Sequence, residues 1–502
     1  MSSETLPLST RLSRDFTASI VVFLVAMPLC MGIAIASGVA PEKGLITGII
    51  GGLIVGLFAG SPLQVSGPAA GLAVIVFEIV RTQGLTALAA ILVLAGVIQL
   101  VAGIVKIGGW FRAISPAVVH GMLAGIGVLI VVGQFHVLFD DKPLPSGLAN
   151  LAAMPGQLLG LDNQGALVAF LIGLLTIGGM IGWEKIRPAS MKLVPGALVG
   201  VLLATFAAWF FSLPVARVVV PESIFAAVTP PGDGFVGMML SPAILTTALA
   251  VAFIASAETL LSAAAVDGMH NGVRTDYNKE LRAQGIGNFL CGMAGALPMT
   301  GVIVRSSANV QAGAVSRLST ILHGVWILAF VALLPWLLRE IPMAALGGIL
   351  VVTGVRLVSI AHAKHLLHLY GPLPALVWIV TLVMVVATDL LTGVLVGLAL
   401  SLIELLPHYR KLRLRMHDNE HDGRREIALD GTATFLTLPR LLGKLEGLNM
   451  SKRVVLNIER LSHIDHTCAE MLRDWVKRRR NAGQEIDLKG SNAKMQQLIQ
   501  PH

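Results

Sequence analysis

Long apolar segments recur along most of this chain, and they constrain its fold more than any other feature. Between Phe16 and about Tyr409, apolar runs follow one another with only short polar breaks. A helix needs about 20 mainly apolar residues to cross the hydrocarbon core of a bilayer. Hydrophobic residues make up 55% of the 502 residues and charged residues only 13%, unlike a soluble protein. The chain is therefore predicted to be a polytopic α-helical membrane protein surrounded by lipid.

Charged residues and breaks that contain Pro or Gly divide the apolar region into about 14 spans. Short loops and the two termini carry most of the Lys and Arg, which the positive-inside rule places in the cytoplasm. Both termini, including a cytoplasmic N-terminus at 1–15, are thus expected on the inner side of a bacterial-type plasma membrane. The predicted spans are 16–37, 43–59, 68–82, 85–105, 113–139, 165–183, 193–212, 241–265, 281–297, 304–316, 318–338, 342–360, 373–390 and 391–408.

Charge and motifs exclude several classes of function. The net charge of +8 needs no nucleic acid as a partner, because the positive-inside loops explain it. The three cysteines, Cys30, Cys291 and Cys468, form no pair pattern and no CxxC motif, so neither disulfides nor a zinc site is indicated. The sequence has no Walker, nucleophile-elbow or HExxH motif. We therefore expect a protein that is not an enzyme, without catalytic residues, cofactor or metal site.

Two segments, 60–71 and 297–309, place Pro, Gly and hydroxyl residues at membrane depth. Irregular backbone is tolerated there only where protein buries it or a cavity adjoins it. A pair of interrupted segments at matching positions of two halves is typical of inverted repeats with a binding site at the bilayer midplane. Two inverted repeats of about seven spans each are therefore predicted, at 16–212 and 241–408.

The short helices that follow the two breaks are expected to direct their N-termini toward each other. Free N–H groups and the positive ends of the helix dipoles favour an anion in the gap. Small residues let the main chain approach such a ligand, and the charge of Arg305 would add to the dipole. A salt bridge to an acidic residue is the structural alternative for Arg305. The predicted substrate-binding residues are Ala69, Ala70, Gly71, Val302, Ile303, Val304, Arg305 and Ser306.

Glu258 lies deep in the first span of the second half. An ionisable residue at that depth costs several kcal/mol and indicates a functional role, although a carboxylate that hydrogen-bonds a helix end for structure is the alternative. Ser262, one turn farther on, lies on the same helix face.

The composition changes abruptly after Pro407. Residues 454–459 have the pattern of a strand, and residues 467–480 have that of an amphipathic helix with a basic end. About 85 residues are enough for an independent fold. A small α/β domain is therefore predicted at 413–502, and the transport domain at 16–409.

Several motifs resemble the SulP sulfate-permease family of anion transporters, and the resemblance covers essentially the whole chain. The opening span at 26–41, the Val65-Ser-Gly-Pro68 turn and the stretches at 287–292 and 305–313 are similar to the family's first, third, ninth and tenth spans. The tail resembles a STAS domain, as in anti-sigma-factor antagonists. The segments that carry this second likeness are 429–435, 455–458 and 464–467.

The resemblance implies a uracil-permease-like fold with core and gate domains, commonly in a homodimer. It implies a small inorganic or carboxylate anion as substrate, such as sulfate, bicarbonate, chloride or a dicarboxylate. It makes Glu258 the coupling residue, which binds H⁺ or Na⁺, with Ser262 completing a sodium shell. Thr467 matches the approximate position at which STAS domains of sigma-factor regulators are phosphorylated.

We therefore expect secondary active transport by an elevator-like movement of the core domain against the gate domain. An ionised Glu258 would repel the anion, and a bound H⁺ or Na⁺ would remove that repulsion. The alternatives left open are an uncoupled exchanger or channel, a nucleobase:cation symporter, and a regulatory protein with a vestigial transport half. Also open is whether the STAS domain responds to phosphorylation, a ligand or a cytoplasmic protein partner.

Overall fold

The computed structural model forms two compact units. The first comprises Met1–Gly108, Leu123–Val358 and Val385–Leu391, and the second comprises Gly109–Met122, Ser359–Met384 and Thr392–His502. The structure describes residues 7–111, 115–144, 146–159, 163–191, 193–219, 223–232, 234–270, 272–405, 414–421, 424–435, 437–446, 453–481, 483–490 and 493–500.

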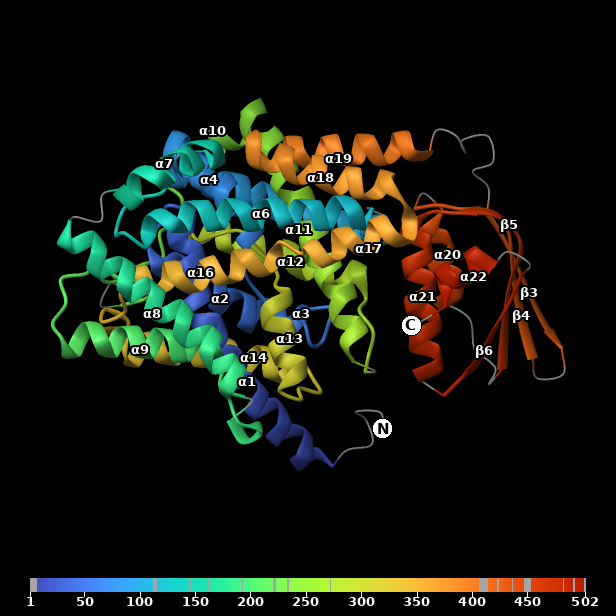
Figure 1. Cartoon of the computed structure of the whole chain (residues 1–502), viewed down its shortest axis with the longest axis horizontal. Helices are drawn as coiled ribbons and strands as arrows, with labels where there is room; N and C mark the ends of the chain where they lie inside the picture. Colours follow the sequence, from blue (N-terminus) through green and yellow to red (C-terminus); the bar gives the residue numbers. More distant parts are fainter. Residues whose placement is uncertain are drawn as a thin grey trace. The chain divides into compact units, whose positions relative to one another are not determined.

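The first unit is almost entirely helical (Figure 1). A π-helical turn at Gly51–Val55 and 3₁₀ turns at Ala70–Leu72 and Ala189–Met191 interrupt the α-helices. Its elements are α1 (Leu8–Ala36), α2 (Pro41–Ile50), α3 (Gly56–Phe58), β1 (Ser66–Pro68), α4 (Ala73–Ile104), most of α6 (Pro116–Val137), α7 (Gly147–Leu159), α8 (Gln164–Ile186), α9 (Gly196–Phe210), α10 (Phe235–Met239), α11 (Pro242–Met269), α12 (Tyr277–Met293), β2 (Met299–Gly301), α13 (Ile303–Gln311), α14 (Leu318–Leu333), α15 (Pro335–Leu338) and α16 (Met343–Leu357).

Each predicted span corresponds to a described helix. Seven described helices are long and apolar enough to cross a membrane, and four shorter ones are also apolar. The predicted spans 68–82 and 85–105 are joined in α4, which is interrupted at Gly84, where φ is 81°. The last residues of the predicted span 391–408, and the predicted domain limits at 409 and 413, lie outside the described residues.

The first helix begins earlier than the sequence indicated. Residues 8–15, predicted to belong to a cytoplasmic terminus, form the start of α1. The reason is tertiary, because Asp15 is 1% exposed and accepts hydrogen bonds from the backbone N–H groups of Val315 (2.8 Å) and Ser316 (3.0 Å). This contact joins the start of the first repeat to the loop that follows α13.

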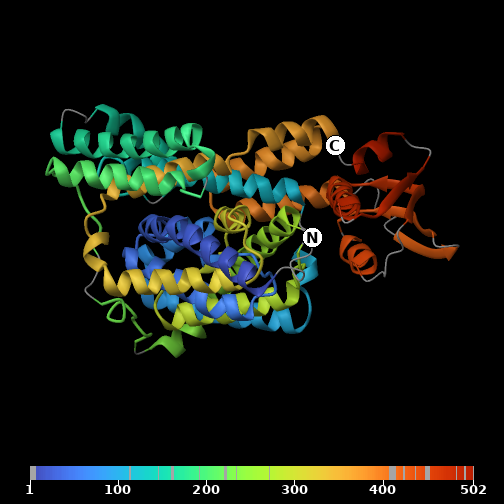
Figure 2. The ribbon, with the colours of Figure 1, turned by 90° about the horizontal axis from the view of Figure 1, so that it is seen from below.

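Helices of the two predicted repeats interleave within the first unit. Figures 1 and 2 both show the blue helices of the first repeat among the yellow and light-green helices of the second. One close pair is α4 and α12, where a Cβ placed on Gly96 would lie 2.4 Å from the backbone nitrogen of Phe289. A Cβ on Gly285 would likewise lie 2.6 Å from the nitrogen of Leu100. Small residues thus bring two helix backbones into direct contact, as membrane helices require for tight packing.

The second unit combines membrane helices with an α/β domain. Its elements are α5 (Gly108–Phe111), the start of α6, α17 (Ile360–Tyr370), α18 (Pro372–Ala387), α19 (Leu390–Leu405), β3 (Leu414–His421), β4 (Arg424–Ala433), α20 (Leu438–Glu446), β5 (Arg453–Ile464), α21 (His466–Asn481), β6 (Glu485–Lys489) and α22 (Ala493–Ile499).

The α/β domain is a four-stranded sheet in the order β3-β4-β5-β6. The pair β3/β4 is antiparallel, and the other two pairs are parallel. The predicted strand at 454–459 lies in β5, and the predicted helix at 467–480 lies in α21. The apolar core of this domain includes Trp475 and Ile499, and Tyr370 at the end of α17 packs against it. The end of α17 therefore packs against the core of the α/β domain.

Thr467, the predicted regulatory residue, lies in the first turn of α21. Thr467 is 1% exposed, and its hydroxyl oxygen is buried. The first turn of α21 is drawn inward because Asp465 accepts hydrogen bonds from the N–H groups of Phe435 (2.6 Å) and Cys468 (2.8 Å). Burial also raises the pKa of the Cys468 thiol. A kinase could reach this hydroxyl only if the turn opened, and regulation through Thr467 stays a prediction.

The contact between α4 and α12 yields a test of packing. We expect Gly96→Ala to lower stability by about 1–3 kcal/mol, because the backbone of α12 leaves no space for a methyl group. Gly178→Ala in α8 is the matched control, since no atom lies within 4 Å of its added Cβ and Ala favours helix. Apparent melting temperatures of the detergent-solubilised proteins measure both effects. Equal temperatures for the two variants would contradict the close approach.

Candidate functional site

The two interrupted segments meet in a short buried ribbon. Strand β1 pairs antiparallel with β2, with Gly67 opposite Thr300. The pairing extends beyond the strands, because the N–H of Ala69 donates to the carbonyl oxygen of Pro298 (3.0 Å) and the N–H of Val302 donates to that of Val65 (2.9 Å). All six strand residues are buried. Irregular backbone at membrane depth is thus satisfied by pairing with its counterpart from the other half.

A short helix leaves each strand of the ribbon. The 3₁₀ turn at Ala70–Leu72 and the part of α4 before Gly84 follow β1, whereas α13 follows β2. Because the strands are antiparallel, the two helices begin at opposite ends of the ribbon with their positive dipole ends toward its middle. The first N–H groups of each helix lack a helical carbonyl to bond.

This geometry corrects one detail of the predicted anion site. The backbone of 69–71 was expected to face that of 302–304 directly. Instead, Ala69 lies opposite Pro298, and Val302 lies opposite Val65, so the length of the ribbon separates the two predicted groups. The N–H groups of Ala69 and Val302 are also used in the pairing. Ala70, Gly71, Ile303 and Val304 remain at the two helix starts.

Side chains from three helices hold the outer edge of β2. Asn288 of α12 accepts a hydrogen bond from the N–H of Met299 (2.7 Å) and donates to its carbonyl oxygen (3.0 Å). Thr259 of α11 accepts from the N–H of Gly301 (3.1 Å). Thr47 of α2 does the same for the residue two positions before Met299 (2.9 Å). The strand is therefore fixed on both edges.

The residues that fix β2 were missed by the sequence reasoning. Thr47 and Thr259 are single polar residues in apolar helices, and Asn288 lies in the 287–292 stretch, for which the sequence indicated only the family likeness and no structural role. Asn288 also donates to Gln99 (2.8 Å), which in turn donates to Ser256 (3.1 Å), so one buried network connects α12, α4 and α11. A polar side chain inside a predicted span was the only available signal, because its groups need partners at that depth.

Ser306 belongs to the framework of the ribbon. Its hydroxyl accepts a hydrogen bond from the N–H of Val65 (2.9 Å) and donates to the carbonyl oxygen of Val302 (2.7 Å). The only proton of the hydroxyl is thus already donated within the protein. The structure therefore places Ser306 in the crossing of the two segments, where its first role is to position the start of α13.

Glu258 lies against the helix start of the other repeat. A Cβ placed on Gly71 would be 2.9 Å from its Oε2 atom, and the N–H of Gly71 and the hydroxyl of Thr300 face the carboxylate. The Oε2 atom is buried without a hydrogen-bond partner among the described residues. Ser262 is 2% exposed and lies one turn farther along α11. Only a glycine at position 71 allows this approach.

Arg305 carries a buried charge that forms no ion pair with the described residues. The residue is 0% exposed, and none of its three guanidinium nitrogens has a hydrogen-bond acceptor in the part of the chain that the structure describes. A Cβ on Gly67 would lie 2.0 Å from Nη1, and the thiol of Cys30, which is uncharged at neutral pH, is a neighbour. Within the described ranges, the predicted alternative of a salt bridge is not formed.

Arg305 and Glu258 share one face of the ribbon. Gly67 and Thr300 are directly opposite in the antiparallel pair, so their side-chain directions point to the same face. The guanidinium lies on the Gly67 side and the carboxylate near Thr300. A buried unpaired charge is costly unless a ligand compensates it. This face can therefore bind an anion at Arg305 and a cation at Glu258.

Most of the chain is similar to known proteins. The family model described as Sulfate permease family matches residues 12–381. The putative sulfate transporter YvdB of Bacillus subtilis (strain 168) is 29% identical over 513 residues, which cover 97% of this chain and 93% of that protein. The bicarbonate transporter BicA of Picosynechococcus sp. is 25% identical over 405 residues, which cover 76% of this chain and 68% of that protein.

Solved structures show the same fold. The transmembrane domain of a cyanobacterium bicarbonate transporter BicA matches with a TM-score of 0.67 and 25% identity, covering 76% of this chain and 97% of that one. The overall structure of SLC26A9 matches with a TM-score of 0.67 and 15% identity, covering 99% of this chain and 87% of that one. The predicted fold class, a polytopic helical membrane protein with a small α/β domain, is confirmed, and the C-terminal sheet fits a STAS domain.

The side-chain hydrogen bonds that hold the outer edge of β2 can be tested at Thr259. We expect Thr259→Val to lower stability by about 1–3 kcal/mol, because the buried N–H of Gly301 would lose its acceptor. Thr259→Ser keeps the hydroxyl and should retain most of the stability. Thermal unfolding of the three purified proteins measures the difference. If the Ser variant were as unstable as the Val variant, lost packing of the methyl group would explain the effect better than the hydrogen bond.

Proposed function

Because the chain belongs to the sulfate permease family, as its motifs indicated, we propose that it carries a small inorganic or carboxylate anion by secondary active transport. The family is one of transporters and not of enzymes. One observation carries the proposal, namely the fully buried guanidinium of Arg305 without an acceptor in the described chain. An anion that enters from water would supply the missing charge and the missing acceptors.

The site favours a compact oxyanion. A guanidinium offers donors in a fixed fork, which matches the oxygens of sulfate, bicarbonate or a carboxylate. The starts of the two short helices add N–H groups and a positive potential from both ends of the ribbon. Two relatives are named for sulfate and bicarbonate, respectively, which supports an anion of this class.

Coupling to a cation follows from the second charge of the site. An ionised Glu258 on the same face as the anion would repel it, and a bound H⁺ or Na⁺ would remove the repulsion. Because the Glu258 carboxylate contacts Gly71, a cation bound at Glu258 would lie next to the helix start that borders the anion. If the coupling ion is Na⁺, Ser262 would provide an oxygen ligand. No cofactor besides this coupling ion is part of the proposal.

The proposed movement is elevator-like alternating access, in which the ribbon and the helices that hold it travel together. The hydrogen bonds from α2, α11 and α12 to β2 support a rigid carrier of this kind. The chain is a multi-pass membrane protein. We place it in a bacterial-type inner membrane with both termini in the cytoplasm, and we propose a homodimer.

The coupling proposal is tested by transport into proteoliposomes. We expect the wild type to accumulate labelled sulfate, bicarbonate or fumarate only under an inward proton or sodium gradient. Glu258→Gln, which stays neutral, should lose this dependence because its charge no longer has to be compensated. If Glu258→Gln accumulated the anion as the wild type does, Glu258 would be structural. If neither protein used a gradient but both exchanged anions, the uncoupled exchanger would be the better description.

The anion site is tested at Arg305. We expect Arg305→Gln to raise the KM for the transported anion about 10- to 100-fold, because a charge-assisted hydrogen bond contributes about 1.5–3 kcal/mol. Arg81→Gln is the control for loss of a positive charge, since Arg81 is exposed and paired with Glu78. Initial rates over a range of anion concentrations separate KM from the maximal rate. An unchanged KM in a folded Arg305→Gln protein would contradict the assignment.

A further inference from the structure

A large cavity opens in the first unit, on the membrane face opposite the N-terminus. Its volume is about 790 Å³. This position is inferred from α1, which crosses the membrane. The helix begins at Leu8 near the N-terminus and ends at Ala36, next to the Gly38–Pro41 turn that lines the cavity. The remaining walls come from the end of α6 with the residues after it, the segment around Arg217, and Met343 at the start of α16. This cavity is named the vestibule below.

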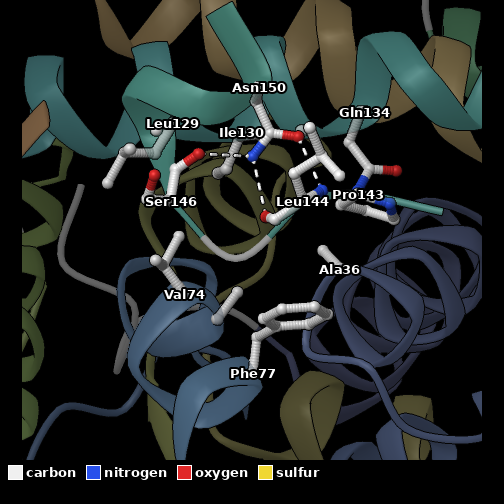
Figure 3. Close-up of a pocket in the computed structure, with 13 residues that line it drawn as sticks. Ala36, Val74, Phe77, Leu129, Ile130, Gln134, Pro143, Leu144, Ser146 and Asn150 are labelled. Carbon is white, nitrogen blue, oxygen red and sulfur yellow. Dashed lines mark hydrogen bonds between the residues drawn. The ribbon is translucent and has the colours of Figure 1, made fainter. Parts of the chain in front are cut away.

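A second, much smaller cavity lies next to the start of α4. Its volume is about 30 Å³, enough for about one water molecule. Figure 3 shows Val74 and Phe77 of α4 on one side and Leu129 and Asn150 on the other. The amide of Asn150 is engaged in holding the loop before α7, since it exchanges hydrogen bonds with the backbone of Leu144 (2.8 Å each). The inner cavity is therefore a defined space between α4, α6 and this loop.

Phe77 and Pro143 line both cavities and therefore separate them. The Phe77 ring is held from behind, because a Cβ on Gly38 would lie 2.8 Å from its Cδ2 atom. Gly38 has φ of 70°, a backbone conformation that favours glycine. Figure 3 shows the Phe77 ring directed from α4 toward the open space below Leu144. The constriction between vestibule and inner cavity thus consists of one aromatic ring and one proline.

The inner cavity lies next to the helix start that borders the candidate site. Ala73, which lines it, follows the turn that contains Gly71, and Gly71 contacts Glu258. Phe77 lines both cavities, Ala73 lines the inner cavity, and Gly71 contacts the carboxylate, which suggests a route in this order from the vestibule to Glu258. A hydrated ion needs more room than about one water molecule, so an ion that follows this route has to displace the Phe77 ring.

We propose that Phe77 is the gate residue that controls access from the vestibule to the site around Glu258 and Arg305. The inference rests on the proposed transport function, because it assigns a route to that site. The substrate class is the same small anion, together with its coupling cation. Phe77 acts through the size of its ring, so reducing the ring should open the route and enlarging it should narrow the route.

The test measures access directly and needs no knowledge of the transported anion. Val74→Cys places a thiol in the inner cavity, and a small anionic methanethiosulfonate reagent serves as the probe on intact cells. We expect Val74→Cys to react at least about tenfold faster when combined with Phe77→Ala, and Phe77→Leu to have an intermediate effect. Ala40→Cys in the vestibule is the control and should react at the same rate with either residue at 77. The protein without added thiols gives the background, since all three native cysteines are buried.

Several outcomes would overturn the gate. Equal reaction rates of Val74→Cys with Phe or Ala at position 77, with Ala40→Cys reactive, would show that the ring does not limit access. An equal acceleration of Ala40→Cys would show that Phe77→Ala loosens the protein in general. Phe77→Leu provides the comparison if the Ala variant fails to fold. The labelling experiment measures no transport, so a failed transport assay would not contradict the gate. Likewise, a failed labelling experiment would not contradict the anion site.

Discussion

Antiparallel pairing of two three-residue strands inside a membrane protein is the interaction on which the rest of this structure depends. The strands come from different halves of the chain, and the pairing of Gly67 with Thr300 fixes their register. Without it, the peptide groups on either side of two short helices would be unsatisfied at a depth where water is absent. With it, the helices begin at opposite ends of one ribbon, and their dipoles act on the same small volume.

The backbone framework of the site has hydrogen-bond partners, whereas a charged side chain within it does not. Side chains of Thr47, Thr259 and Asn288 satisfy the outer edge of β2, and Ser306 satisfies the crossing point. In contrast, the guanidinium of Arg305 has no acceptor in the described ranges. A rigid, fully bonded frame that holds unsatisfied charged groups is what a binding site for ions requires, because the frame does not have to reorganise when the ligand arrives.

The sequence predicted much of the fold, including the two broken segments that meet in the ribbon. Hydropathy and the Pro and Gly residues at 60–71 and 297–309 were sufficient, because lipid leaves few options for apolar helices and for broken backbone. The register of the ribbon could not be predicted, since it depends on hydrogen bonds between distant segments. For the same reason the roles of Asn288 and Thr259 were missed, because a single polar residue in an apolar helix has no periodic signal. The burial of the Thr467 hydroxyl could not be predicted either, because burial is a property of packing, which a local motif does not encode.

The origin of the two strands also has a consequence for the way the protein is made. Strand β1 leaves the ribosome roughly 230 residues before β2, which at about 5–20 residues per second is an interval of roughly 10–50 s. During that interval the N–H of Val65 lacks the hydroxyl of Ser306, and the carbonyl oxygen of Val65 lacks the N–H of Val302. The first half of the transporter therefore spends the time of its synthesis with an incomplete centre. Its maturation ends only when the second half enters the membrane beside it.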